Sequence, residues 1–216
     1  MSPPLLLGHR GARATRTIPE NTLQSFDLAL AHGCDGIEFD VRLTADERAV
    51  ICHDSMTCGC EVAQAAADDL PQLPRLESVL NRYANQAFLD IELKVKGLES
   101  ATLNALYFDP PRRGFVVSSF LPELLTALRE LDAEIPLGLI CETRSQLMLW
   151  KTLPIQYLIP HHTLVDGKLC EVAHGAGKKV FVWTVNRKEF MAHFRDIGVD
   201  AVISDATELL VEVLKR

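Results

Sequence analysis

The sequence predicts an α/β fold in which eight parallel strands alternate with eight helices and close into a (β/α)8 TIM barrel. Short apolar runs alternate with longer amphipathic segments along the chain, and there are eight of each. An all-parallel sheet needs both faces covered, so eight such units favour closure into a ring. No repeat, linker or low-complexity tract interrupts the 216 residues, and we therefore expect one domain spanning 1–216.

The strand candidates are four to seven residues long and are bounded by turn residues or charges. They are LLLG (5–8), GIEF (36–39), FLDIEL (88–93), FVVSS (115–119), PLGLI (136–140), QYLIP (156–160), KVFVWTV (179–185) and AVIS (201–204).

The helical candidates carry apolar residues at helical spacing between these strands. They are residues 21–31, 75–83, 98–107, 122–131, 143–151, 165–176, 187–197 and 206–214. The first has the clearest boundaries, because Asn21 or Thr22 can cap its start and Gly33 can end it.

One segment departs from the alternation. The run AVICHD (49–54) follows VRLT (41–44) after only four residues, whereas a parallel crossover needs a dozen or more. We therefore expect residues 40–54 to form a hairpin-like excursion after the second strand, which folds His53 back beside Asp40. Residues 55–74 are expected to be irregular, with one short helical turn near 63–67.

Composition excludes several classes of protein. With 48% hydrophobic and 24% charged residues, a net charge of -7 and dispersed acids, the chain lacks the basic footprint of a nucleic-acid binder. Residues 1–8 have no basic residue before their three leucines, so we expect neither a signal peptide nor stable membrane insertion. The six cysteines are expected to be reduced, as in the cytoplasm, and Cys58 and Cys60 are too close to suggest a bridge.

Polar residues cluster where the first three strands end, which is where barrels of this kind carry their reactive groups. They are His9 and Arg10, Glu38 and Asp40, His53 and Asp54 on the hairpin, and Glu92 and Lys94.

Three of these residues suggest a metal site. Glu38 and Asp40 leave the same face of one strand, and Glu92 adds a carboxylate from the adjoining strand. Converging carboxylates repel one another unless a hard cation binds their oxygens, so we expect one divalent cation, Mg²⁺ or Ca²⁺, rather than zinc. The alternative is that the acids only form ion pairs with the neighbouring cations Arg10, Arg42 and Lys94.

The remaining groups fit hydrolysis of a phosphodiester. His9 and His53 can supply the base and the acid that such a reaction needs. Arg10 and Lys94 can bind the non-bridging phosphate oxygens, although either can also only balance the acids.

Several segments together resemble one known family in order and spacing. They are His9-Arg10-Gly11-Ala12, Pro19-Glu20-Asn21-Thr22, Gly36-Ile37-Glu38-Phe39-Asp40-Val41, Cys52-His53-Asp54, Asp90-Ile91-Glu92-Leu93-Lys94, Ser118-Ser119-Phe120 and Trp183-Thr184-Val185-Asn186. The family is that of the glycerophosphodiester phosphodiesterases, and the resemblance covers about residues 5–205.

This resemblance implies a barrel of the phospholipase C-like phosphodiesterase type that releases sn-glycerol 3-phosphate and an alcohol from small glycerophosphodiesters. It assigns acid/base catalysis to His9 and His53, and phosphate binding to Arg10 and Lys94. The metal ligands would be Glu38, Asp40 and Glu92, and Trp183 would lie near the glycerol.

Some roles stay open at this point. Trp183 can equally be a core aromatic, Asn21 can be a helix cap or a ligand near the metal, and the nucleophile can be the glycerol hydroxyl or water. The loop 9–19 is longer, and the segment after Asp54 shorter, than the family pattern, so the alcohol is undefined. Two other functions remain: hydrolysis of lysophospholipids, and binding of phosphorylated ligands without turnover.

Overall fold

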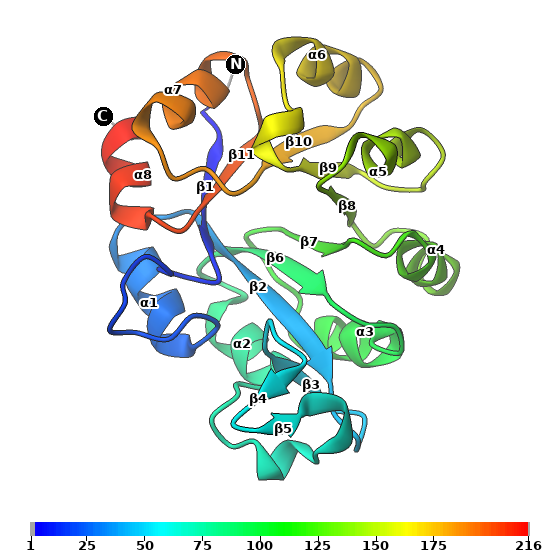
Figure 1. Cartoon of the computed structure of the whole chain (residues 1–216). Helices are drawn as coiled ribbons and strands as arrows, with labels where there is room; N and C mark the ends of the chain where they lie inside the picture. Colours follow the sequence, from blue (N-terminus) through cyan, green and yellow to red (C-terminus); the bar gives the residue numbers. More distant parts are fainter. Residues whose placement is uncertain (1–2, 216) are drawn as a thin grey trace.

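The structure, a computed structural model, describes residues 3–215 and contains a closed ring of eight parallel strands (Figure 1). These strands are β1 (Leu5–His9), β2 (Gly36–Leu43), β6 (Phe88–Leu93), β7 (Phe115–Ser119), β8 (Leu137–Cys141), β9 (Tyr157–Pro160), β10 (Lys179–Val182) and β11 (Ala201–Ser204). β1 closes the ring by pairing in parallel with both β11 and β2. The predicted barrel is confirmed, and each strand candidate corresponds to one strand of the ring.

The described residues also form eight α-helices, which surround the ring (Figure 1). They are α1 (Leu23–Ala31), α2 (Leu76–Tyr83), α3 (Glu99–Phe108), α4 (Pro122–Leu131), α5 (Arg144–Met148), α6 (Gly167–Gly175), α7 (Lys188–Asp196) and α8 (Thr207–Leu214). All eight helical candidates are confirmed, although α5 is short and continues as a 3-10 turn over Leu149–Lys151.

The strands alternate between two apolar layers because successive side chains leave opposite faces. One face packs against the helices, as Ile37, Phe39 and Val41 of β2 do. The other face fills the ring, where Phe88, Tyr157 and Phe181 meet at ring-centroid distances of 5.0 to 6.5 Å.

The interior side chains change from apolar to polar along the strands that build the site. Leu7 of β1 is followed on the same face by His9, and Phe88 of β6 is followed by Asp90 and Glu92. The ring is therefore a packed core at the amino ends of its strands, and the polar side chains lie at the carboxyl ends.

The expected excursion after the second strand is present. β2 continues to Leu43 and pairs in antiparallel fashion with β3 (Ala49–Ile51), and the amide of Cys52 donates to the carbonyl of Asp40 at 2.9 Å. This contact places His53, the next residue, beside the end of β2, as predicted.

The segment that follows is more regular than expected. It contains a small hairpin, β4 (Met56–Thr57) with β5 (Cys60–Glu61), and 3-10 turns at Val62–Gln64 and Ala67–Asp69. The hairpin turn holds Cys58 and Gly59 at positive φ of 49° and 79°. A cysteine rarely adopts this conformation, so its residue type did not predict the turn.

Two further expectations concern bridges and membranes. All six cysteines are free, as predicted for Cys58 and Cys60. Within residues 3–215, no helix combines the length and apolar character that a membrane crossing needs.

Candidate active site

A cavity of about 310 Å³ lies at the carboxyl ends of the barrel strands, and each strand of the ring, or the residue that directly follows it, contributes to its wall. Its lining residues are His9, Arg10, Glu38, His53, Asp90, Glu92, Lys94, Phe120, Ile140, Glu142, Ile159, Trp183 and Ile203. Seven of the eight site residues predicted from sequence line this cavity, and the eighth, Asp40, is buried next to it.

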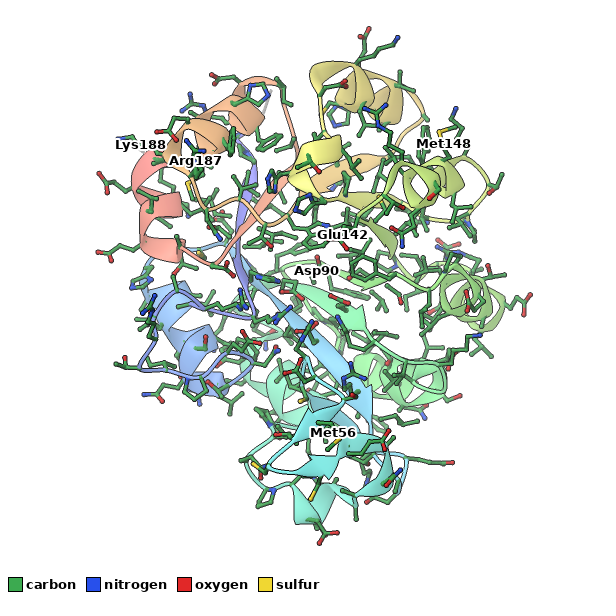
Figure 2. The ribbon with its side chains drawn as sticks, in the orientation of Figure 1. Met56, Asp90, Glu142, Met148, Arg187 and Lys188 are labelled. Atoms are coloured by element: carbon green, nitrogen blue, oxygen red, sulfur yellow. The ribbon has the colours of Figure 1, made fainter. Side chains whose placement is uncertain are left out.

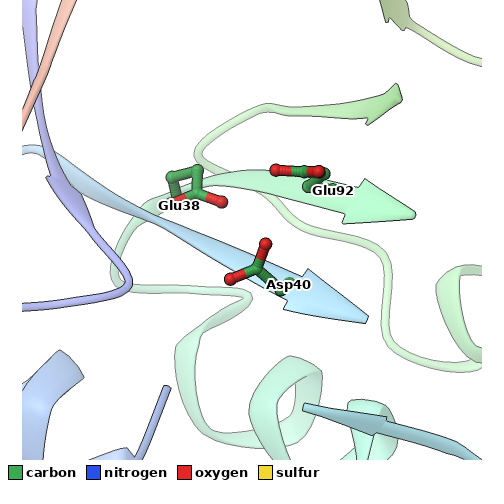
Figure 3. Close-up of side chains that lie close together, drawn as sticks. All are labelled: Glu38, Asp40 and Glu92. Carbon is green, nitrogen blue, oxygen red and sulfur yellow. The ribbon is translucent and has the colours of Figure 1, made fainter. Parts of the chain in front are cut away.

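Three carboxyl groups converge beside the cavity. Figure 3 shows Glu38 and Asp40 of β2 and Glu92 of β6 turned toward a common space. One ligand oxygen from each lies within 4.8 Å of the others, and all three side chains are buried. Strand register explains the arrangement, because Asp40 is the direct partner of Glu92.

The electrostatics of this cluster are uneven. Burial, together with the charges of Asp40 and Glu92, raises the pKa of Glu38 well above its ordinary value. Burial and Asp40 raise the pKa of Glu92 to about 7. Burial acts in the same direction on Asp40, but the nearby Lys94 and Arg10 lower its pKa. The cluster therefore holds ionised Asp40 beside two carboxyls that resist ionisation.

The three residues fit a hard divalent cation. Glu38 Oε1 and Asp40 Oδ1 are buried and make no hydrogen bond, although Lys94 Nζ lies 3.1 Å from Asp40 Oδ1. Buried polar atoms without a partner are uncommon in folded proteins, and an oxygen-only donor set suits Mg²⁺ or Ca²⁺. The donor set does not suit zinc, which favours histidine and cysteine.

The alternative of ion pairs is also realised in part. Arg10 Nε lies 3.0 Å from Asp40 Oδ2, and Lys94 Nζ lies 2.5 Å from Glu92 Oε1. Arg42, the third candidate cation, instead donates from Nε to the carbonyl of His53 at 2.8 Å. Two of the three candidate cations thus pair with the acids, and the same acids could also hold a metal ion.

A fourth carboxyl group, Asp90, was not predicted as a site residue. It lies two residues before Glu92, on the same inner face of β6. Its Oδ1 accepts a hydrogen bond from the hydroxyl of Ser118 at 2.5 Å. Its Oδ2 is buried and has no hydrogen-bond partner. Burial raises the pKa of Asp90 to about 7. The period-two pattern of FLDIEL contained this signal, because residues 90 and 92 share a face.

His9 is held by Asp205, which the sequence analysis did not assign, and Asn186 in turn holds Asp205. Its Nδ1 lies 2.7 Å from Asp205 Oδ1, while its Nε2 lies 3.8 Å from Glu38 Oε2. Asn186 fixes Asp205 by donating from Nδ2 to Oδ2 at 2.6 Å and by accepting from its amide at 2.9 Å. Although burial opposes it, the hydrogen bond with His9 lowers the pKa of Asp205 to about 2.

His53 approaches the cavity from the excursion rather than from a ring strand. Its Nδ1 lies 2.8 Å from Asp54 Oδ1, and its side chain is 35% exposed. In both histidines an aspartate therefore engages Nδ1, which leaves Nε2 available to a ligand in the cavity.

Asn21 supports the carboxylate cluster and does not cap the helix. Its Nδ2 donates to Asp40 Oδ2 at 2.8 Å, and its Oδ1 accepts from the amide of Asp40 at 3.3 Å. The cap of α1 is Thr22, whose hydroxyl accepts from the amide of Ser25. Asn21 has a positive φ of 57°, a conformation that asparagine tolerates, and it contacts β2 instead.

The aromatic side of the cavity contains Trp183 and Phe120. Their rings pack edge to face at a centroid distance of 5.7 Å, and Trp183 Nε1 donates to the carbonyl of Ile159 at 2.9 Å. Trp183 thus combines a structural hydrogen bond with a position in the cavity wall.

Comparisons with known proteins agree with this architecture. Residues 9–209 match the model of the glycerophosphoryl diester phosphodiesterase family. A glycerophosphodiester phosphodiesterase of Caldanaerobacter subterraneus subsp. tengcongensis is 26% identical, and the match covers 98% of both chains.

Solved structures show the same fold. A phosphodiesterase of Oleispira antarctica in complex with the product sn-glycerol-3-phosphate is 25% identical, with a TM-score of 0.86 over 99% of this chain and 98% of that one. A glycerophosphodiester phosphodiesterase of Parabacteroides distasonis is 24% identical, with a TM-score of 0.88 over 98% and 97% of the two chains. With its fold, its cavity and a family match over nearly all of its length, the chain belongs to the glycerophosphoryl diester phosphodiesterase family.

Proposed function

We propose that this protein is a metal-dependent enzyme that hydrolyses glycerophosphodiesters to sn-glycerol 3-phosphate and an alcohol. The observation that carries the proposal is the buried carboxylate cluster, in which Glu38 Oε1 has no hydrogen-bond partner, beside a cavity that two histidines line. The similarity to the Oleispira antarctica enzyme, whose structure contains sn-glycerol-3-phosphate, supports this choice of product.

Glu38, Asp40 and Glu92 would hold one Mg²⁺ or Ca²⁺ ion. When bound, the cation supplies positive charge for the phosphate oxygens. Asn21 keeps Asp40 in position for this role through its two hydrogen bonds. Second contacts of this kind orient metal ligands in many proteins.

Arg10 and Lys94 bind the phosphate group. Both line the cavity, and both already contact Asp40, so each can turn one face to the acids and another to the substrate. A guanidinium and an ammonium group at this position stabilise the negative charge that grows on phosphorus oxygens during attack.

His9 and His53 transfer the protons. One accepts a proton from the attacking oxygen, which belongs to the neighbouring glycerol hydroxyl or to water, and the other donates to the leaving alkoxide. Asp205 orients His9 through Nδ1, so its Nε2 points toward Glu38 and the cavity. Trp183 lies against the glycerol.

The six free thiols fit a reducing compartment, and a cytoplasmic role in recovering glycerol 3-phosphate from deacylated phospholipids is part of the proposal. This role belongs to both lipid and glycerol metabolism.

The test is hydrolysis of glycerophosphocholine, glycerophosphoethanolamine and a lysophospholipid, with EDTA and with added Mg²⁺ or Ca²⁺. We expect activity on the two deacylated substrates and its loss on chelation. His9→Ala and His53→Ala should each lower kcat by about 100-fold or more. Full activity of both histidine variants would exclude the mechanism, and turnover of the lysophospholipid alone would favour the second candidate substrate.

A further inference from the structure

The cavity has two chemically different sides. β1, β2, β6 and the excursion contribute charged or titratable groups, whereas the five strands β7 to β11 and the residues that directly follow them contribute an almost entirely apolar wall. This apolar side consists of Phe120, Ile140, Ile159, Trp183 and Ile203, together with one charged residue, Glu142.

Glu142 is fixed in its backbone and free in its side chain. Gln146 Oε1 accepts hydrogen bonds from the amides of Glu142 and Thr143, both at 3.0 Å, as part of the capping box that begins α5. Within residues 3–215 the Glu142 carboxylate has no hydrogen-bond or ion-pair partner. Figure 2 shows this residue over the interior of the ring, inside the circle of helices.

Glu142 is exposed, so water can satisfy its carboxylate, but a negative charge in the wall of a cavity that receives an anionic phosphodiester calls for an explanation. It repels the phosphate, and no cation of the apolar side offsets that charge. A neutral hydroxyl group of the substrate could donate a hydrogen bond to this carboxylate, because an ionised carboxylate is a strong acceptor. The rings of Trp183 and Phe120 in the same wall offer apolar surface to the carbon atoms between such hydroxyls.

On the basis of the proposed function, we infer that Glu142 accepts a hydrogen bond from the terminal hydroxyl of the glycerol, and so selects deacylated glycerophosphodiesters over lysophospholipids. In a lysophospholipid acylated at that position, an ester replaces the hydroxyl, so the donor is lost. The acyl chain would also remove water from the carboxylate without replacing its hydrogen bonds.

The glycerol, rather than the alcohol, fits this side of the cavity. Ile140, Ile159 and Ile203 are all nearly fully buried, so the apolar wall is backed by packed core. His53, on the opposite side, is 35% exposed, which leaves room for an alcohol of variable size. The volume of about 310 Å³ suits a compact glycerol phosphate and is small for an acyl chain.

The test compares glycerophosphocholine with its analogue methylated at the terminal glycerol hydroxyl. Glu142→Leu should lower kcat/KM for glycerophosphocholine by about 10- to 100-fold, and leave that for the methyl ether within about threefold. Glu142→Gln keeps an acceptor oxygen and should lie between the wild type and Glu142→Leu. Glu134→Gln is the matched control, because Glu134 is an exposed carboxylate at the other end of β8, and it should behave as the wild type.

A binding measurement gives a second readout that needs no turnover. Calorimetry should show about tenfold weaker binding of sn-glycerol 3-phosphate to Glu142→Leu, whereas binding of inorganic phosphate should not weaken, because the removed carboxylate repels the anion. Equal losses for glycerophosphocholine and the methyl ether, or no loss for either, would overturn the inference. A loss with glycerophosphocholine but none with glycerophosphoglycerol would also overturn it, because Glu142 would then bind the cationic alcohol. A wild-type protein inert toward every diester would instead remove the proposed function, and this inference with it.

Discussion

His9 Nδ1 and Asp205 Oδ1 lie 2.7 Å apart although 196 positions separate them in the sequence. Closure of the ring brings them together, because β1 pairs with β11 and Gly8 is the partner of Ser204. An aspartate at Nδ1 fixes the tautomer and the orientation of the imidazole. The residue that directly follows the last strand of the barrel therefore orients a histidine on the first.

Replacing Asp205 should impair the chemical step more than the fold. We expect Asp205→Asn to lower kcat by about 100-fold, because His9 loses the carboxylate that selects its tautomer. Asp54→Asn is the matched comparison, since Asp54 makes the equivalent contact to His53 but is 78% exposed, where water can substitute. Steady-state kinetics across pH measures both variants. A kcat within twofold of the wild type for Asp205→Asn would contradict this role.

Two adjacent residues separate support of the metal site from helix capping. Asn21→Ala removes both hydrogen bonds to Asp40 and should weaken the metal affinity by about 10- to 100-fold. Thr22→Ala removes the cap of α1 and should cost about 1 kcal/mol of unfolding free energy with the metal affinity unchanged. Titrating the activity of each variant with Mg²⁺ measures its metal affinity, and urea denaturation measures its unfolding free energy. Equal metal affinities in both variants would assign Asn21 a purely structural role.

The stability of the protein should depend on pH through Glu92. Burial and Asp40 raise its pKa from an ordinary 4.5 to about 7, so the folded carboxyl binds its proton more tightly than the unfolded one. Its contribution to stability is complete below its unfolded pKa and is lost as the pH rises through about 7. In EDTA, Tm should therefore fall between about pH 5 and pH 8.

Added Mg²⁺ or Ca²⁺ should raise Tm more at the higher pH, because the ligands must be ionised to bind it. Calorimetry at a series of pH values measures this effect, and Glu92→Gln, which cannot ionise, should remove much of it. An increase in Tm that is the same at every pH and in the variant would count against the proposed ligand set.

Two glycines should respond oppositely to alanine. A Cβ at Gly36 would lie 2.1 Å from the carbonyl oxygen of Phe88, so Gly36→Ala forces β2 away from β6 and should cost at least about 1–3 kcal/mol. Gly175 lies in α6 with no atom within 4 Å of such a Cβ, and Gly175→Ala should stabilise by about 0.5–1 kcal/mol. Urea denaturation measures the unfolding free energy of both variants. A Gly36→Ala protein as stable as the wild type would contradict the predicted clash with the carbonyl of Phe88.

The sequence was sufficient for the elements of the barrel, because each relies on a local pattern. Alternation along FLDIEL and GIEFD placed Glu38, Asp40 and Glu92 on the inner face, and parallel pairing then aligned Asp40 with Glu92. The short link between residues 44 and 49 likewise required an antiparallel partner for β2.

The features that sequence reasoning missed depend on distant contacts or on rare backbone conformations. The pairing of Asp205 with His9 exists only after the ring has closed. Asn21 has the residue type of a helix cap, but its positive φ directs it to Asp40 and leaves the cap to Thr22. The hairpin after His53 needs Cys58 in a left-handed conformation, which its residue type disfavours.

The edge of β2 that β1 leaves after His9 is occupied by β3, outside the ring. His53, a proposed proton-transfer group, thus follows an accessory strand that takes no part in barrel closure. Residues 54–74 consequently lie outside the pairing that sets the register of the eight ring strands. Under the proposed function, the segment beside the alcohol is therefore separate from the ring strands that carry the metal-binding carboxylates.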